Sequence, residues 1–202
     1  MTVKQLRPIL HTALAIPFVY YSYLLYQSDL GADPAEALNK AFGTLTIRLL
    51  LLNLLWGILI HITKTQAFRK FSILRRPLGV WTFIYAVFHV AFYFVKENDF
   101  NISMEQIITK LYLNFGAVSW IILGLLALTS NDYSVRKLKF KSWKNLHRLV
   151  YAALYLSIIH YALIEKADPR WTAAYAVPIT LLYLWRSIQS RTSSRLAKRP
   201  SN

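Results

Sequence analysis

The 202-residue sequence contains no cysteine, only six glycines and only nine acidic residues. Without cysteine, the chain cannot form disulfides, thiolate nucleophiles, iron–sulfur clusters or Cys-ligated zinc sites. The six glycines form no glycine-rich phosphate loop, which excludes the common nucleotide-binding motifs. Because 24 Lys and Arg face so few acids, the net charge is +15. Several kinds of chemistry are therefore excluded at once.

Long apolar stretches are abundant, and 55% of the residues are hydrophobic. Six stretches are long enough to cross a hydrocarbon core of about 30 Å, which takes about 20 residues of helix. They cover residues 8–27, 45–62, 78–95, 111–129, 146–164 and 171–189. The segments between them are too short for a soluble domain. The sequence therefore predicts an all-α integral membrane protein, with a six-helix transmembrane bundle over residues 1–189 and a basic tail over residues 190–202.

Basic residues are concentrated in alternate segments, namely the N-terminus, the second and fourth loops and the C-terminal tail. All the acids except Asp132 fall in the other loops. Because short loops rich in Lys and Arg stay in the cytoplasm, both termini are predicted to be cytoplasmic. This topology explains the net charge without a nucleic-acid partner. A basic tail beside a membrane also suits contact with anionic lipid headgroups.

All five histidines lie within or at the edge of a predicted span. Ionisable groups at membrane depth are costly and usually face the bundle interior. A single histidine can be a neutral packing residue, but His89 and His160 lie at similar depths in two parallel spans. Two imidazoles at one level, with no sulfur ligand in the chain, suit a six-coordinate haem iron. We therefore predict that His89 and His160 are axial haem ligands.

His147 lies roughly 20 Å along the helix from His160, so one iron cannot bind both. At the depth of His147 the third span has Arg76 instead of a histidine. His147 is therefore either a packing residue at the cytoplasmic edge or a ligand of a second haem, with His61 or His11 as its partner. The sequence leaves both possibilities open, and with them one haem or two.

Several short motifs occur in an informative order. They are LGADP at 30–34, RRPLG at 75–79, FHV around His89, SW at 119–120, ALTS at 127–130, WKNLHRLVY at 143–151 and IIHY at 158–161. Over nearly all of the spans the chain thereby resembles the MsrQ family, the haem-binding membrane subunits of the bacterial periplasmic methionine sulfoxide reductase system. This family belongs to the ferric-reductase-like transmembrane group.

The resemblance implies a multi-pass protein of the bacterial inner membrane that binds b-type haem and flavin mononucleotide (FMN). It implies electron transfer from the quinone pool or a cytoplasmic flavin reductase. The acceptor would be a periplasmic molybdopterin-containing subunit that reduces protein methionine sulfoxide. The chain would then be an electron-transfer subunit of an oxidoreductase complex, with no catalytic residues of its own. Larger members of the group carry a second histidine on the third helix and a flavin–nicotinamide domain, which are missing here, so the reductant would be external.

Three arginines have two interpretations each. Arg75 and Arg76, at the inner end of the third span, could hold a flavin phosphate or simply mark the cytoplasmic side. Arg48, near the outer end of the second predicted span, could meet a haem propionate or extend to lipid headgroups.

Two other functions fit the buried histidines. In a transporter they would relay protons or bind a metal ion, and in a non-redox anchoring subunit they would only pack. Both alternatives predict a colourless protein, whereas the electron relay is red and reducible.

Overall fold

The computed structural model describes residues 3–63, 71–98, 100–164 and 168–196, and the regular structure in these ranges is helical. Its elements are α1 (Val3–Tyr26), α2 (Pro34–Thr63), η1 (Phe71–Leu74), α4 (Arg75–Glu97), α5 (Phe100–Thr109), α6 (Leu111–Leu128), α7 (Asp132–Leu138), α8 (Phe140–Leu146), α9 (Leu149–Ala162) and α10 (Pro169–Leu196). The predicted all-α class is confirmed. The end of the predicted basic tail, 197–202, and most of the second loop, 64–70, lie outside the described residues.

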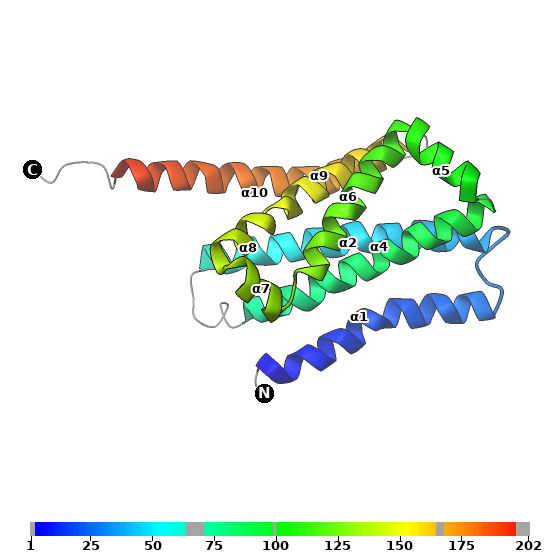
Figure 1. Ribbon diagram of the computed structural model, residues 1–202, viewed down its shortest axis with the longest axis horizontal. Helices are drawn as coiled ribbons and strands as arrows, with labels where there is room; N and C mark the ends of the chain where they lie inside the picture. The colour runs from blue at the N-terminus through cyan, green and yellow to red at the C-terminus, as the bar shows by residue number, and fades with distance from the viewer. Residues whose placement is uncertain (1–2, 64–70, 99, 165–167, 197–202) are drawn as a thin grey trace, which may run out of the picture.

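The long helices form a bundle with two distinct ends (Figure 1). The start of α1, the start of α4 and the short helices α7 and α8 lie at one end, which we call the inner end. The α1–α2 connection and the junction of α4 with α5 lie at the opposite, outer end.

Four helical segments are long and apolar enough to cross a membrane: Gln5–Tyr26, Pro34–Ile60, Phe71–Glu97 and Leu111–Leu128. Large apolar side chains such as Val19 and Ile121 are exposed on them, as expected where a helix faces lipid. These segments fit a multi-pass membrane protein and match four of the predicted spans. The other two predicted spans correspond to α9, which has 14 residues, and α10. That these two also cross the membrane stays a prediction.

Helix α2 begins at Pro34, well before residue 45, where the second span was predicted to start. The Asp33 side chain explains this start, because its Oδ1 accepts a hydrogen bond from the backbone N–H of Glu36 at 2.9 Å. Proline suits the first helical position after such a cap, and Asp-Pro-Ala-Glu follows the capping-box spacing. The hydropathy pattern missed this polar first turn. Consequently Arg48 lies near the middle of α2 and not near its outer end, contrary to our expectation.

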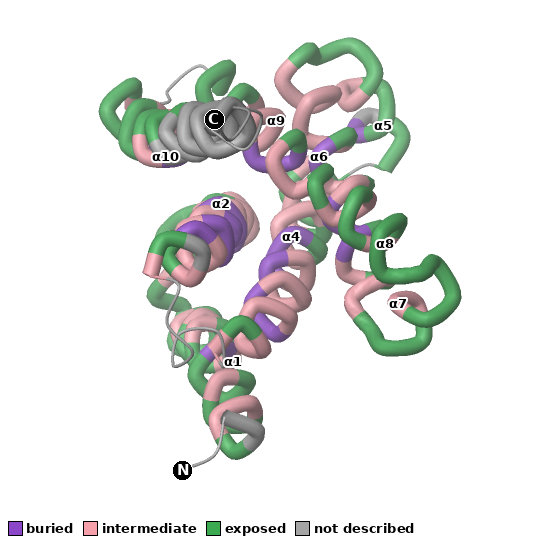
Figure 2. The backbone as a smooth tube through the Cα atoms, turned by 90° about the vertical axis from the view of Figure 1, so that its left-hand side faces the viewer, coloured by how far each residue is buried: buried purple, intermediate pink, exposed green. Residues whose placement is uncertain are grey.

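Two helix pairs make up most of the packing: α2 lies along α4, and α6 lies along α9. The largest buried cluster joins both pairs through residues such as Leu54 on α2, Leu123 on α6 and Leu154 on α9. Figure 2 shows the buried positions concentrated on α2 and α4, whereas α1 is mostly exposed or intermediate. The bundle therefore has a firm centre around α2, α4, α6 and α9, with α1 more loosely attached.

Arg75 fastens the inner end of α4 to α2. Its Nε donates to Asn53 Oδ1 at 3.1 Å, and Asn53 Nδ2 donates to the Arg75 carbonyl at 3.0 Å. A Cβ on Gly57 would lie 2.6 Å from the Arg75 Cζ, so the guanidinium rests directly against the α2 backbone. Arg75 thus has a structural role, because it holds two membrane helices in register.

Replacing Asn53 with alanine should lower the free energy of unfolding by about 1–2 kcal/mol, since both hydrogen bonds to Arg75 are lost inside the bundle. Thermal unfolding of the purified protein in detergent measures this loss. Asn145→Ala, on an exposed residue of α8, provides the control and should melt like the wild type. Equal melting temperatures for all three proteins would contradict a stabilising role for the Arg75–Asn53 contact.

Candidate functional site

His89 on α4 and His160 on α9 face each other inside the bundle. Their ring centres are 6.2 Å apart and the ring planes are inclined by 78°. Both side chains are partly buried. The structure therefore brings together the two histidines that the sequence placed at one depth.

A backbone carbonyl fixes the tautomer of His89. Its Nδ1 lies 2.8 Å from the carbonyl oxygen of Asn39 on α2. The same residue makes a second hydrogen bond to His89, because the Asn39 Nδ2 donates to the His89 carbonyl at 2.7 Å. A carbonyl can only accept, so Nδ1 carries the proton and Nε2 keeps a free lone pair. His89 is thus prepared to bind a metal through Nε2.

His160 is held in the same way by another helix. Its Nδ1 lies 2.7 Å from the carbonyl oxygen of Tyr112 on α6. The Tyr112 ring lies beside it, with ring centres 5.8 Å apart. Both histidines therefore present Nε2 as the free nitrogen. A hydrogen bond from Nδ1 to a carbonyl is the usual support of a metal-ligating histidine.

A glycine makes room for each imidazole on the neighbouring helix. A Cβ on Gly43 would lie 2.8 Å from His89 Nδ1, and a Cβ on Gly116 would lie 2.8 Å from His160 Nδ1. In each case the carbonyl that accepts the hydrogen bond from the histidine Nδ1 belongs to the residue one helical turn before the glycine. Only glycine allows a helix backbone to approach a ring so closely. We call this arrangement of a carbonyl and a glycine on one helix the imidazole cradle.

The sequence analysis missed all four cradle residues: Asn39, Gly43, Tyr112 and Gly116. The only signal was an identical spacing, since an Asn-to-Gly pair and a Tyr-to-Gly pair are each separated by one helical turn. This spacing acquires meaning only when the histidine opposite each pair is known.

The geometry of the pair fits a haem iron. Two imidazoles that share one metal place their ring centres about 6 Å apart, because each metal–nitrogen bond is about 2 Å and each ring centre lies about 1 Å beyond. The 6.2 Å between His89 and His160 agrees with this value. Among the described residues, no group of three or more His, Cys, Asp or Glu could hold a metal ion. Haem would supply the remaining ligands of an iron held by this pair.

Trp120 offers a further polar atom near the site. It lies on α6, one turn beyond Gly116, and its indole Nε1 is buried with no hydrogen-bond partner in the part of the chain that is described. An unpaired buried donor is costly, so a bound group with an acceptor would relieve that cost.

His147 lies at the inner end, away from the facing pair. Its Nε2 is 3.1 Å from Thr129 Oγ1, and its ring centre is 4.0 Å from that of Trp143. The Trp143 indole also donates to the Thr129 carbonyl at 2.9 Å. Among the described side chains, no other histidine has a ring contact or hydrogen bond with His147. The side chain of His61 lies outside that set.

The two adjacent arginines at the start of α4 point to different partners. Arg75 contacts α2, whereas Arg76 Nη1 donates to Asp132 Oδ1 on α7 at 2.8 Å. This hydrogen bond, together with the positive charge of Arg76, holds the pKa of the Asp132 carboxyl below its usual value. The structure therefore does not place the two guanidinium groups on one common ligand.

Arg48 is exposed on α2, and its Cζ lies 5.5 Å from the centre of the Trp171 ring at the start of α10. This distance is typical of a cation–π contact, which stabilises a guanidinium that water does not fully solvate. The structure places Arg48 beside α10 and records no contact between it and the facing histidines.

Comparison with known proteins places this geometry in context. A family model described as "Ferric reductase like transmembrane component" matches residues 42–158, a stretch that includes both facing histidines. A protein-methionine-sulfoxide reductase heme-binding subunit MsrQ from Brucella anthropi is 34% identical over 200 residues, which cover 95% of this chain and 89% of the relative. The subunit of the same name from Brucella ovis is 35% identical over 180 residues, covering 88% of this chain and 80% of the relative.

Proposed function

Because the chain belongs to the MsrQ family of heme-binding subunits, within the ferric-reductase-like transmembrane proteins, we propose that it relays electrons across the bacterial inner membrane. The acceptor is a periplasmic protein-methionine-sulfoxide reductase that repairs oxidised proteins. The chain itself carries out no substrate chemistry. It acts as the electron-transfer subunit of a complex whose catalytic subunit contains a molybdopterin.

The facing pair of imidazoles is the observation that carries this proposal. His89 and His160 would hold one b-type haem through their Nε2 atoms, and their ring separation of 6.2 Å suits binding of one iron by both rings. When bound, the haem supplies one-electron chemistry between ferric and ferrous iron. The Asn39 and Tyr112 carbonyls hold the proton on each Nδ1, which makes each Nε2 a stronger ligand and helps to set the reduction potential.

We propose the topology that the basic residues indicate. The six membrane-spanning segments lie in α1, α2, α4, α6, α9 and α10, and together they make up the haem domain over residues 1–189. Both termini are cytoplasmic, so the inner end of the bundle faces the cytoplasm. The facing histidines then lie towards the periplasmic side, and the basic tail over residues 190–202 contacts lipid headgroups.

Electrons arrive at the inner end from the quinone pool or from a cytoplasmic flavin reductase. His147 and Arg76 lie there, roughly 20 Å of helix from the facing histidines. We propose that this end also binds FMN, with Arg76 as the arginine available to a phosphate, since Arg75 is packed against α2. If a second haem is present, His147 is its ligand.

Arg48 is assigned a supporting role for the haem. It is a cation in the middle of a membrane helix, and its contact with Trp171 holds it beside α10. We propose that it neutralises a haem propionate from there, because a cation at membrane depth is costly and usually pairs with an opposite charge.

The test begins with the purified protein. Its dithionite-reduced spectrum should be that of a low-spin b-type cytochrome, and the pyridine haemochromogen assay gives the number of haems per chain. The reduced protein should then be reoxidised only when both the purified periplasmic catalytic subunit and a methionine-sulfoxide peptide are added.

Each alternative predicts a different result. A colourless protein that binds no haem would support the transporter or the anchoring subunit. A red protein that is not reoxidised by the catalytic subunit would point to a cytochrome serving another acceptor.

A further inference from the structure

Helix α5 is short and lies between two segments that are able to cross a membrane. It follows Phe71–Glu97 and precedes Leu111–Leu128 in the chain. Figure 1 shows it lying across the outer end of the bundle, from the end of α4 to the start of α6. With 10 residues it is about 15 Å long, half of what a membrane crossing takes. The proposed electron relay gives this helix no role.

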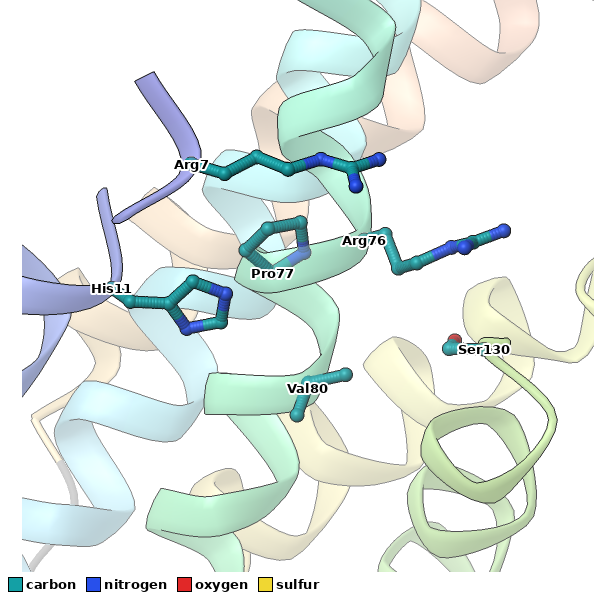
Figure 3. Close-up of a pocket in the computed structure, with 6 residues that line it drawn as sticks. All are labelled: Arg7, His11, Arg76, Pro77, Val80 and Ser130. Carbon is teal, nitrogen blue, oxygen red and sulfur yellow. The ribbon is translucent and has the colours of Figure 1, made fainter. Parts of the chain in front are cut away.

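The depth of α5 follows from the arginines at the other end of the bundle. Arg7 on α1 and Arg76 on α4 lie close together there and line one small pocket (Figure 3). Such side chains extend to the headgroups, so they mark the inner boundary of the hydrocarbon core. A crossing takes about 20 residues, which leads from Arg7 to the end of α1 and from Arg76 to the last turn of α4. Because α5 begins at Phe100, directly after α4, it lies at the outer boundary of the core.

One face of α5 is fastened to the bundle. Ser103 is 0% exposed. The Tyr93 Oη on α4 donates to Gln106 Oε1 at 3.1 Å, and Gln106 Nε2 donates to Glu97 Oε2 at 2.7 Å. These contacts fix the rotation of α5 about its own axis, so the directions in which its other faces point are fixed as well.

A second face of α5 exposes three large apolar side chains, which we call the apolar stripe. Phe100, Met104 and Ile108 are 64%, 39% and 72% exposed. They recur at every fourth residue and therefore span an arc of only about 80° around the helix. A third face is polar and also exposed, and its side chains form the polar stripe: Asn101, Glu105 and Thr109. Separate apolar and polar stripes on one exposed helix are typical of a helix that lies in a membrane surface.

The apolar stripe adjoins a membrane helix at each end. The Phe100 ring stacks on Phe94 of α4, with ring centres 5.0 Å apart. Beyond Ile108, large exposed apolar side chains continue along α6, for example at Leu111 and Ile121. Because α6 is long and apolar enough to cross the membrane, these side chains face lipid. The apolar stripe thus continues the lipid-facing surface of α6.

From its depth, its fixed rotation and this continuity, we propose that α5 is an interfacial helix whose apolar stripe is buried in the lipid leaflet at the outer end. The polar stripe then faces water. Under the proposed topology this is the periplasmic leaflet. The position of α5 favours lipid over a protein partner, because both of its ends are joined to membrane helices at the boundary of the hydrocarbon core. Contact of α5 with lipid is independent of haem binding.

The test uses the absence of cysteine, because single cysteines can be introduced and spin-labelled without a background signal. Met104→Cys and Ile108→Cys report on the apolar stripe, while Glu105→Cys and Thr109→Cys are the matched controls on the polar stripe. The full-length protein is reconstituted into liposomes of phosphatidylcholine and phosphatidylglycerol. Power-saturation electron paramagnetic resonance then measures how accessible each label is to oxygen, which concentrates in lipid, and to a water-soluble nickel chelate.

We expect the ratio of oxygen to nickel accessibility to be several times higher on the apolar stripe than on the polar stripe. The apolar face of an interfacial helix enters the boundary between headgroups and acyl chains by about 5–10 Å, a depth that the nickel chelate does not reach. Phe100→Cys and Asn101→Cys form a second pair, one from each stripe. Circular dichroism checks that every labelled protein keeps the helix content of the wild type.

Equal ratios on the two stripes would overturn the proposal. It would also be overturned if labels on the apolar stripe are open to the nickel chelate in liposomes and become protected only when the purified catalytic subunit is added. That result would make the stripe a protein-docking surface. Spin–spin broadening in labelled Ile108→Cys that disappears on dilution with unlabelled protein would instead assign the stripe to a contact between two copies of the chain. None of these outcomes changes the haem spectrum, which tests the electron relay separately.

Discussion

A His89→Ala variant is expected to lose the low-spin haem spectrum and to retain at least tenfold less haem per chain than the wild type. One imidazole cannot replace two, and removing even a supporting hydrogen bond from a metal ligand costs 10–100-fold in affinity. His160→Ala should behave in the same way, because the two rings face each other across 6.2 Å. Absorption spectra of the oxidised and dithionite-reduced proteins measure both effects.

Rescue by free imidazole separates ligation from folding. Alanine leaves a space the size of the lost ring, so millimolar imidazole should restore the low-spin spectrum in both variants if their bundles are intact. His147→Ala, analysed in parallel, shows how many haems the chain holds, since it should reduce the haem count only if a second haem exists. A normal spectrum in His89→Ala or His160→Ala without imidazole would rule out the assignment of that residue.

The depth of the two histidines could be predicted from the sequence because a membrane constrains helices so strongly. Hydropathy located the spans and their parallel direction, and the rise per residue then placed His89 and His160 at one level. The start of α2 could not be found in this way. The first turn of α2 is polar, and the hydrogen bond from the Asp33 cap determines where the helix begins. Hydropathy detects only the apolar part of the helix. This error placed Arg48 too close to the outer end.

The partners of the histidines could not be predicted, because they depend on contacts between helices. Nothing in the sequence indicates that the Asn39 carbonyl meets His89 or that the Tyr112 carbonyl meets His160. Likewise, the adjacent Arg75 and Arg76 looked like one pair, yet successive residues on a helix point about 100° apart. The packing of α4 between α2 and α7 therefore gives each arginine its own role.

Replacing Gly43 with alanine is expected to lower haem affinity 10–100-fold, the cost of disturbing the support of a metal ligand. The new methyl group would lie 2.8 Å from His89 Nδ1, so the ring must move and its hydrogen bond to the Asn39 carbonyl must lengthen or break. That hydrogen bond makes Nε2 more basic and so favours ferric iron. The midpoint potential of the haem that remains bound should therefore rise, which spectroelectrochemical titration measures.

Two further glycine variants, one in the imidazole cradle of His160 and one outside both cradles, make this prediction specific. Gly116→Ala should have the same two effects through His160, since its added Cβ would also lie 2.8 Å from Nδ1. Gly124→Ala, on the same helix, meets only the edge of the Phe83 ring, at 3.1 Å, and this ring can turn aside. It should leave the potential unchanged. A general loss of stability would lower the haem content without altering the midpoint potential of the haem that remains bound. If the cradles position the ligands, the midpoint potential should shift in Gly43→Ala and Gly116→Ala but not in Gly124→Ala.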